Sequence, residues 1–157
     1  MLIDGRQMHI QITKGDIGRY VILPGDPARC EKIAQYFDDP KQIAHNREYT
    51  LWTGSLDGVP VAVCSTGIGG PSAAIAMEEL AALGAHTFLR IGTCGGLQPE
   101  CPEGTFVASQ KSIGFDGLIN FYARRNEICD LETEAEFKRQ VKWNDQIGNP
   151  YCVNNDP

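Results

Sequence analysis

Three short apolar segments of this chain each lead directly into a loop that contains glycine. An apolar run followed by turn residues is typical of a buried strand that ends at a loop. Such strands, alternating with helical segments, are typical of α/β proteins, and we expect that fold class here. The apolar segments are residues 20–23, 61–64 and 86–91, and the loops that follow them are residues 24–27, 67–70 and 92–96.

Helices and one hairpin are expected between these strands. Residues 28–37 place apolar side chains on one side of a helix and charged side chains on the other. Residues 73–83 are rich in Ala, Leu, Met and Glu, which favour helix, and Gly84 is placed to end it. Residues 48–52 and 59–64 are extended segments joined by an Asp-Gly turn, which predicts an antiparallel hairpin.

The later part of the chain has a weaker pattern. We expect strands at residues 105–109 and 113–115 and a charged helix over residues 131–143, whereas residues 144–157 show no periodicity. No internal repeat or linker separates these segments from the rest. The sequence therefore predicts a single domain over residues 1–157.

Composition excludes several classes of protein. The chain has 157 residues, 14 Lys and Arg against 20 Asp and Glu, and 42% hydrophobic residues, so a disordered or fibrous chain does not fit. It lacks the block of basic residues that binding to nucleic acid or to an anionic membrane needs. With no apolar stretch long enough to span a bilayer and no export signal, we expect a cytoplasmic protein.

The six cysteines are spread along the chain and form no Cys-x-x-Cys pair. Together with the missing export signal, this favours free thiols over a disulfide framework. No cysteine lies near a histidine at the spacing of a zinc finger, so a structural metal has little support.

Glycine loops at strand ends let the backbone approach an oxyanion closely, particularly where a helix begins at the loop. For the loop of residues 67–70, a tight turn between strand and helix is an equally good explanation when the loop is taken alone. None of the loops ends in Gly-Lys-Ser or Gly-Lys-Thr, which disfavours kinase or ATPase chemistry.

Arginines next to these loops point more clearly to an anion. Arg29 follows the first loop, Arg90 precedes the third, and Arg47 leads into the hairpin. Guanidinium groups bind phosphate oxygens in pairs, so three of them could hold a phosphate dianion together. Each alone could be a surface ion pair, but Arg90 ends an apolar strand and needs a partner or an anion.

Four ordered segments resemble the nucleoside phosphorylase family, and within it the uridine phosphorylases. The resemblance covers roughly residues 8–100 in order and spacing, whereas residues 104–157 fit less clearly. It implies a mixed central sheet flanked by helices. The segments are Leu23–Arg29, Arg47–Tyr49, Cys64–Ser72 and Phe88–Thr93.

The resemblance also implies roles for individual residues. Gly25, Arg29, Arg90 and Thr93 would bind phosphate within one subunit, with Arg90 and Thr93 at the reacting centre. Arg47 would reach the phosphate of a neighbouring subunit.

The nucleoside would have its own contacts. His9 would cross the subunit interface to the ribose 5′-hydroxyl, with Thr93 and Gly95 beside the ribose and base. Taken alone, a histidine near an N-terminus is a surface residue.

A monovalent cation such as K⁺ is a further implication, held by Glu48, Ile68 and Ser72. An ion-paired Glu48 and a helix-capping Ser72 explain these residues equally well.

The implied reaction is reversible phosphorolysis of uridine to uracil and ribose 1-phosphate, with phosphate as co-substrate and without an organic cofactor. Sites shared across an interface would require a homo-oligomer, at least a dimer and in this family up to a hexamer.

The later sequence departs from the family pattern. We find no match for the residues that bind the pyrimidine and the ribose hydroxyls, or for the last strands and the long C-terminal helix. We therefore expect a truncated chain with little activity alone. A purine nucleoside phosphorylase or nucleosidase, a non-catalytic phosphate- or nucleotide-binding fragment and an oligomerisation fragment remain as alternatives.

Overall fold

The computed structural model describes the chain except for residues 1, 97, 123, 125–128, 143–150 and 155–157. Two compact units are present, Met1–Cys94 and Gly95–Pro157, and each is described by itself. Among the described residues, no helix has both the length and the apolar character needed to cross a bilayer.

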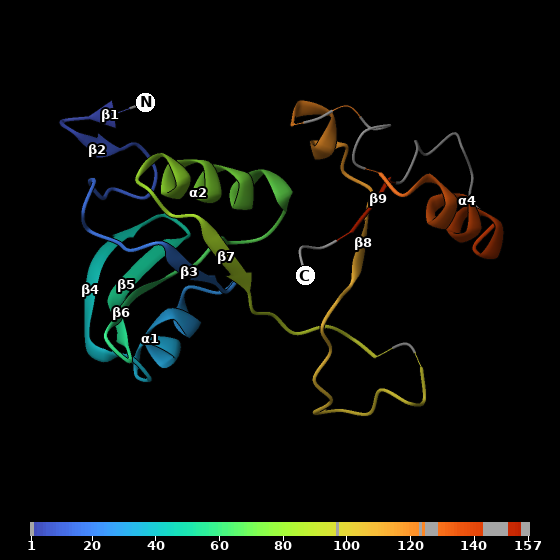
Figure 1. Ribbon diagram of the computed structural model, residues 1–157, viewed down its shortest axis with the longest axis horizontal. Coiled ribbons are helices and arrows are strands. Elements are labelled where there is room, and N and C mark those ends of the chain that lie inside the picture. The colour runs from blue at the N-terminus through green and yellow to red at the C-terminus, as the bar shows by residue number, and fades with distance from the viewer. Residues whose placement is uncertain (1, 97, 123, 125–128, 143–150, 155–157) are drawn as a thin grey trace. The chain divides into compact units, whose positions relative to one another are not determined.

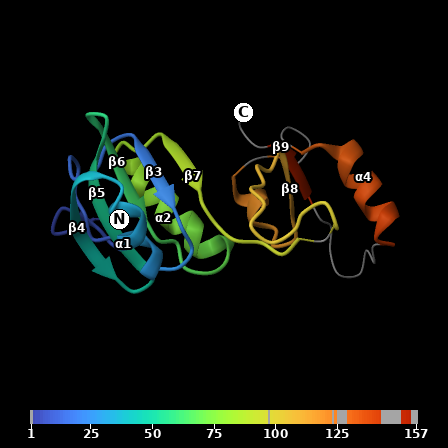
Figure 2. The same cartoon turned by 90° about the horizontal axis from the view of Figure 1, so that it is seen from below.

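The first unit is built on a five-stranded mixed sheet in the order β4-β5-β6-β3-β7. Figure 2 shows the strands side by side from β4 to β7. Strands β3, β6 and β7 are parallel to one another, whereas β4, β5 and β6 pair antiparallel. Parallel strands end at the same edge of a sheet, so the three loops that follow β3, β6 and β7 meet there. The strands are β3 (Tyr20–Leu23), β4 (Asp38–Asn46), β5 (Tyr49–Leu56), β6 (Val59–Cys64) and β7 (Thr87–Arg90).

Helices α1 (Ala28–Ala34) and α2 (Gly70–Ala82) lie on opposite sides of this sheet (Figure 1). Alternation along β3 explains this, because successive strand residues point to opposite faces. Val21 and Leu23 pack in the cluster that contains residues of α2, whereas Ile22 packs against the cluster that contains residues of α1.

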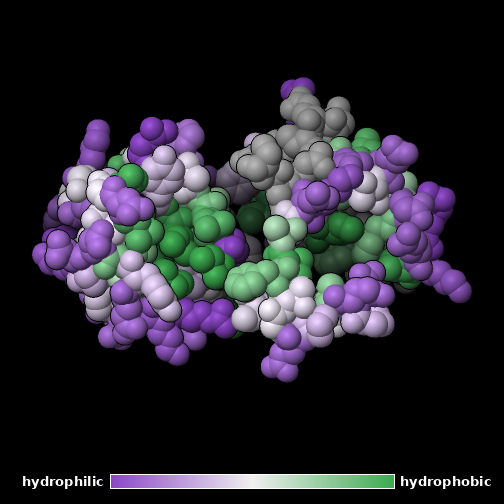
Figure 3. All heavy atoms as spheres, turned by 60° about the horizontal axis from the view of Figure 1, so that its bottom comes forward, coloured by the Kyte–Doolittle hydropathy of each residue, from purple (hydrophilic) through white to green (hydrophobic). Residues whose placement is uncertain are grey.

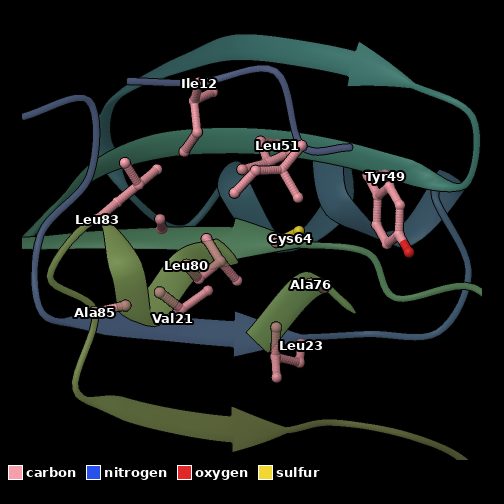
Figure 4. Packing of buried hydrophobic residues seen from close by; sticks show 12 residues of the cluster. Ile12, Val21, Leu23, Tyr49, Leu51, Cys64, Ala76, Leu80, Leu83 and Ala85 are labelled. Atoms are coloured by element: carbon pink, nitrogen blue, oxygen red, sulfur yellow. The ribbon is translucent and has the colours of Figure 1, made fainter. Parts of the chain in front are cut away.

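The larger cluster forms the core between α2 and the sheet (Figure 4). It also receives Ile10 and Ile12 from the N-terminal segment, which includes the short strands β1 (Leu2–Ile3) and β2 (Arg6–Gln7). Figure 4 labels Ile12, Val21, Leu23, Tyr49, Leu51, Cys64, Ala76, Leu80, Leu83 and Ala85 of this core.

The predicted α/β class and mixed sheet are confirmed. Strand β3 has the predicted bounds, α1 is three residues shorter than predicted, and α2 begins three residues earlier. Strand β4 was not predicted. It contains a proline and two register shifts against β5, and most of its residues are exposed, so it lacks the alternation by which strands are recognised.

The second unit contains strands β8 (Lys111–Gly114) and β9 (Tyr151–Asn154), which pair antiparallel. Helix α4 (Leu131–Gln140) is capped at its N-terminus by Asp130, whose side chain accepts a hydrogen bond from the Thr133 N–H. A short 3₁₀ helix, η1 (Leu118–Phe121), lies between β8 and α4 in sequence.

Predictions for this unit are mixed. The predicted strand over residues 105–109 is wrong, since these residues form no regular element. The predicted helix is present up to Gln140, whereas Trp143 lies outside the described residues. Strand β9 lies in the tail that shows no periodicity, and it was not predicted. It is defined by its pairing with β8, which is a contact between distant parts of the chain.

Large apolar side chains are exposed on both units, and Figure 3 shows apolar surface on each. On the first unit, Leu89 and Ile91 are exposed on and just after β7, which pairs only with β3 among the described residues. On the second unit, Phe106 and Phe121 are almost fully exposed.

All six cysteines are free thiols. Burial raises the pKa of the Cys30 thiol to about 11 and raises the pKa of Cys64 as well. Both lie in the core and serve as small apolar side chains, whereas Cys94 is exposed in the third glycine loop.

Candidate functional site

A pocket of about 640 Å³ lies where the loops after β3, β6 and β7 meet. All of its lining residues belong to the first unit. It brings together six of the predicted site residues, which come from four separate stretches of the chain. These are Gly25, Arg29, Glu48, Ile68, Arg90 and Thr93.

Main-chain hydrogen bonds hold the three loops together. The Thr66 N–H donates to the Pro24 carbonyl and the Gly67 N–H to the Gly25 carbonyl, both over 2.9 Å. The Ile91 N–H donates to the Leu23 carbonyl over 3.2 Å. The hydrogen bonding of the parallel strands therefore continues into the loops, so the pocket floor is fixed by backbone.

The guanidinium of Arg90 lies against two glycines, and it occupies space that a Cβ at Gly92 would fill. A Cβ at Gly25 would lie 3.4 Å from Arg90 Nη2, and a Cβ at Gly92 would lie 2.7 Å from Nη1. Nη1 donates to the Ile91 carbonyl over 2.6 Å and to the Leu23 carbonyl over 3.4 Å. The side chain is oriented by backbone oxygens, and within the described residues its other N–H groups have no hydrogen bond that would compete with a ligand.

Arg29 approaches the pocket from α1. Its Nη2 lies 3.5 Å from Thr93 Oγ1, a contact between residues 64 positions apart. The start of α1 is fixed by Asp26, whose Oδ1 accepts the Ala28 N–H over 2.9 Å. An arginine at the second position of this helix is thus carried to the loop that follows β7.

Glu48 enters the pocket from the β4–β5 turn. Its Oε1 accepts the Ser72 hydroxyl over 2.9 Å, and the Thr66 carbonyl is a second acceptor close to that hydroxyl. The pKa of Glu48 is lowered, first by a bond from its own backbone N–H and then by Ser72. Gly67 is required here, since its φ is +67° and a Cβ would lie 2.9 Å from the Cβ and Cγ of Glu48.

The charged side chains that line the pocket are balanced. Arg29 and Arg90 oppose Asp26 and Glu48, so one chain alone supplies no excess positive charge. Both carboxylates are already hydrogen-bonded, Asp26 to the Ala28 N–H and Glu48 to Ser72. The arginine side of the pocket is therefore the side suited to an oxyanion.

Four predicted site residues do not line this pocket. Ser72 donates its hydroxyl to Glu48, which does line the pocket. Arg47 is exposed in the β4–β5 turn with a φ of +54°. Gly95 begins the second unit. His9 lies against α2, where its Nδ1 is 2.7 Å from Glu79 Oε1.

The predicted site residues did not include Asp26, Gly92 or Glu79. Asp26 and Gly92 lie within glycine loops that were identified as a whole. Glu79 could have been noticed because helical spacing puts it beside Ala76 and Leu80, on the buried face of a mostly apolar helix.

A profile of the phosphorylase superfamily matches residues 19–149, which is most of the chain. The chain belongs to the phosphorylase superfamily. The matched region includes all three loops of the pocket and excludes His9.

Individual members of the superfamily are also similar. The uridine phosphorylase of Treponema pallidum is 57% identical over 117 residues, which cover 74% of this chain and 45% of that protein. The guanosine phosphorylase of Halorubrum lacusprofundi is 44% identical over 143 residues, which cover 90% of this chain and 59% of that protein. The chain spans about half the length of the curated relatives it matches.

A solved structure supports the fold. The crystal structure of uridine phosphorylase from Vibrio fischeri superposes with a TM-score of 0.62 at 36% identity, covering 65% of this chain and 43% of that chain. The mixed sheet and its flanking helices are therefore those of a phosphorylase superfamily protein.

Proposed function

We propose that this chain carries the phosphate-binding part of a nucleoside phosphorylase that converts uridine and phosphate to uracil and ribose 1-phosphate. The observation that carries the proposal is the orientation of Arg90 by two backbone carbonyls, between two glycines and facing the same pocket as Arg29 and Thr93. The uridine phosphorylases among its relatives support the choice of substrate. A cytoplasmic location and a role in pyrimidine salvage accompany the proposal.

The chemistry follows from charge and position. Phosphate attacks the anomeric carbon while the bond to the base breaks and the ribose gains positive charge, so a correctly placed dianion is both nucleophile and counter-charge. Arg90 and Arg29 would hold its oxygens, and the Thr93 hydroxyl, 3.5 Å from Arg29 Nη2, would contact phosphate or ribose. No side chain needs to form a covalent intermediate.

A homo-oligomer, at least a dimer, completes this proposal. Because the charges lining the pocket are balanced within one chain, a further cation would favour the binding of a dianion. Exposed Arg47 would supply it from a second copy. Gly95 would lie beside the nucleoside. Substrates and partners are small molecules and copies of this chain, without nucleic acid or membrane.

A monovalent cation such as K⁺ is a second component of the proposal. Glu48 Oε1, the Ser72 hydroxyl and the Thr66 carbonyl gather close together, and oxygen ligands of this kind suit a hard cation. Ile68 would add its main-chain oxygen from the same loop.

Titration calorimetry with phosphate tests the site. Arg90→Ala should weaken binding by about ten- to a hundredfold, the usual effect of losing charged hydrogen bonds. Arg19→Ala is the matched control, because this exposed arginine precedes β3, whereas the pocket follows it. Equal binding by wild type and Arg90→Ala would refute the assignment. Ribose 1-phosphate should compete with phosphate, and ribose 5-phosphate should compete less.

Guanosine is the alternative substrate, favoured by the guanosine phosphorylase relative, which aligns with 90% of this chain. Chromatography of the free base, after incubation of a completed chain with phosphate and either uridine or guanosine, discriminates the two. Release of guanine in excess of uracil would replace the pyrimidine assignment and leave the phosphate site unchanged.

A further inference from the structure

Glu79 places a carboxylate on the buried face of α2. Its side chain is 11% exposed, and Ala76 and Leu80 on the same face are fully buried in the core. A charged group in such a position requires hydrogen-bond partners, because burial removes its water. The pocket chemistry described above does not use Glu79.

Two main-chain N–H groups and one ring nitrogen from the N-terminal segment meet this carboxylate. The His9 main-chain N–H lies 3.0 Å from Oε2, and the Ile10 N–H lies 2.9 Å from the same oxygen. The His9 ring nitrogen Nδ1 lies 2.7 Å from Oε1, which also receives the His9 N–H at 3.2 Å. With both oxygens accepting main-chain N–H groups, the carboxylate acts as acceptor toward Nδ1 too, so Nδ1 carries a proton.

Protonation of Nδ1 determines what the rest of the ring can do. A neutral imidazole has one N–H and one acceptor nitrogen, so Nε2 becomes the acceptor. Free histidine in water prefers the opposite tautomer. Glu79 therefore selects the less common form of His9.

The ring is also held in place. The His9 carbonyl accepts the Asn46 side-chain amide over 2.7 Å, and the ring meets Tyr49 edge-on at a centroid distance of 6.4 Å. The side chain stays 25% exposed. No hydrogen bond of Nε2 is found within the part of the chain that the structure describes.

We propose that Glu79 is a positioning residue for nucleoside binding, which holds Nδ1–H of His9 and so leaves Nε2 as an oriented acceptor for a ligand hydroxyl. This inference rests on the proposed function and on the resemblance to nucleoside phosphorylases, which implies that His9 reaches the ribose 5′-hydroxyl across a subunit interface. Glu79 touches no substrate and acts only through His9.

Nitrogen NMR of the histidine-labelled full chain at pH 8.5 tests the proposal without an activity assay. We expect His9 to be protonated at Nδ1 and not at Nε2 in the wild type, and to shift toward the Nε2–H form in Glu79→Gln. Exposed Glu78→Gln is the matched control and should leave His9 unchanged. His45, whose Nδ1 lies 2.8 Å from Thr50 Oγ1, is an internal reference in every sample.

Uridine titration adds the functional readout. It should perturb His9 Nε2, with affinity about three- to tenfold lower in Glu79→Gln, while phosphate affinity stays constant. An Nε2–H or doubly protonated His9 in the wild type would overturn the inference even if Glu79→Gln fails to fold. An unchanged tautomer in a folded Glu79→Gln would also overturn it. Phosphate binding that is equally strong in the wild type and in Arg90→Ala would instead count against the proposed function.

Discussion

Arg90 Nη1 lies 2.7 Å from the point that a Cβ atom on residue 92 would occupy. Gly92→Ala should therefore displace this guanidinium, which can move because it ends a flexible side chain. We expect phosphate affinity to fall about tenfold or more, as for Arg90→Ala, with little change in stability. In calorimetry, the double variant Gly92→Ala/Arg90→Ala should bind phosphate no more weakly than either single variant. Additive losses would show that the two residues act separately.

Gly67→Ala should behave differently, although it lies in the same pocket. Its φ of +67° disfavours a side chain, and the new Cβ would meet the Cβ and Cγ of Glu48, close to the backbone, rather than a flexible end. We expect a loss of about 1–3 kcal/mol in the free energy of unfolding, measured by urea denaturation. Stability equal to that of Gly92→Ala would contradict this distinction.

Arg47 can be tested by mixing two defective proteins. If Arg47 serves the pocket of a second copy, a hybrid dimer of Arg47→Ala and Arg90→Ala has one pocket with both arginines intact. Random mixing should then restore about a quarter of the phosphate sites, counted by calorimetry after subunit exchange. If native mass spectrometry detects the hybrid dimer but no phosphate sites are recovered, Arg47 does not serve the pocket of a second copy.

Asp130 links β8 to the start of α4 in the second unit. Lys111 Nζ lies 2.6 Å from its Oδ2, and this bond, together with the Thr133 N–H, lowers the pKa of Asp130 to about 2. Because the pKa of Asp130 is lower in the folded than in the unfolded chain, its ionised carboxylate stabilises the fold at pH values above the unfolded-state pKa, near 4. This contribution is lost as pH falls toward 2. Asp130→Asn should therefore unfold more easily at pH 7, by circular dichroism, and the difference should shrink between pH 4 and 2. A constant difference would refute the linkage.

The parts of the fold that were predicted well from the sequence are those determined by residues close together along the chain. Glycines directly after apolar runs indicated where β3, β6 and β7 end, and the parallel arrangement of those strands brings Arg29 and Arg90 to one pocket. Distant contacts that involve neither the glycine loops nor their arginines were not predictable. His9 and Glu79 are separated by 70 positions, and strand β4 is defined by its pairing with β5 rather than by its own pattern.

The main-chain hydrogen bonds that join the three loops have a consequence for how this architecture can diversify. Since the pocket floor is assembled by backbone within the first unit, exchanging the region after residue 94 need not rebuild it. Chimeras that graft residues 1–94 onto the remainder of the uridine phosphorylase or guanosine phosphorylase relatives should then share one pocket floor, whichever remainder follows it.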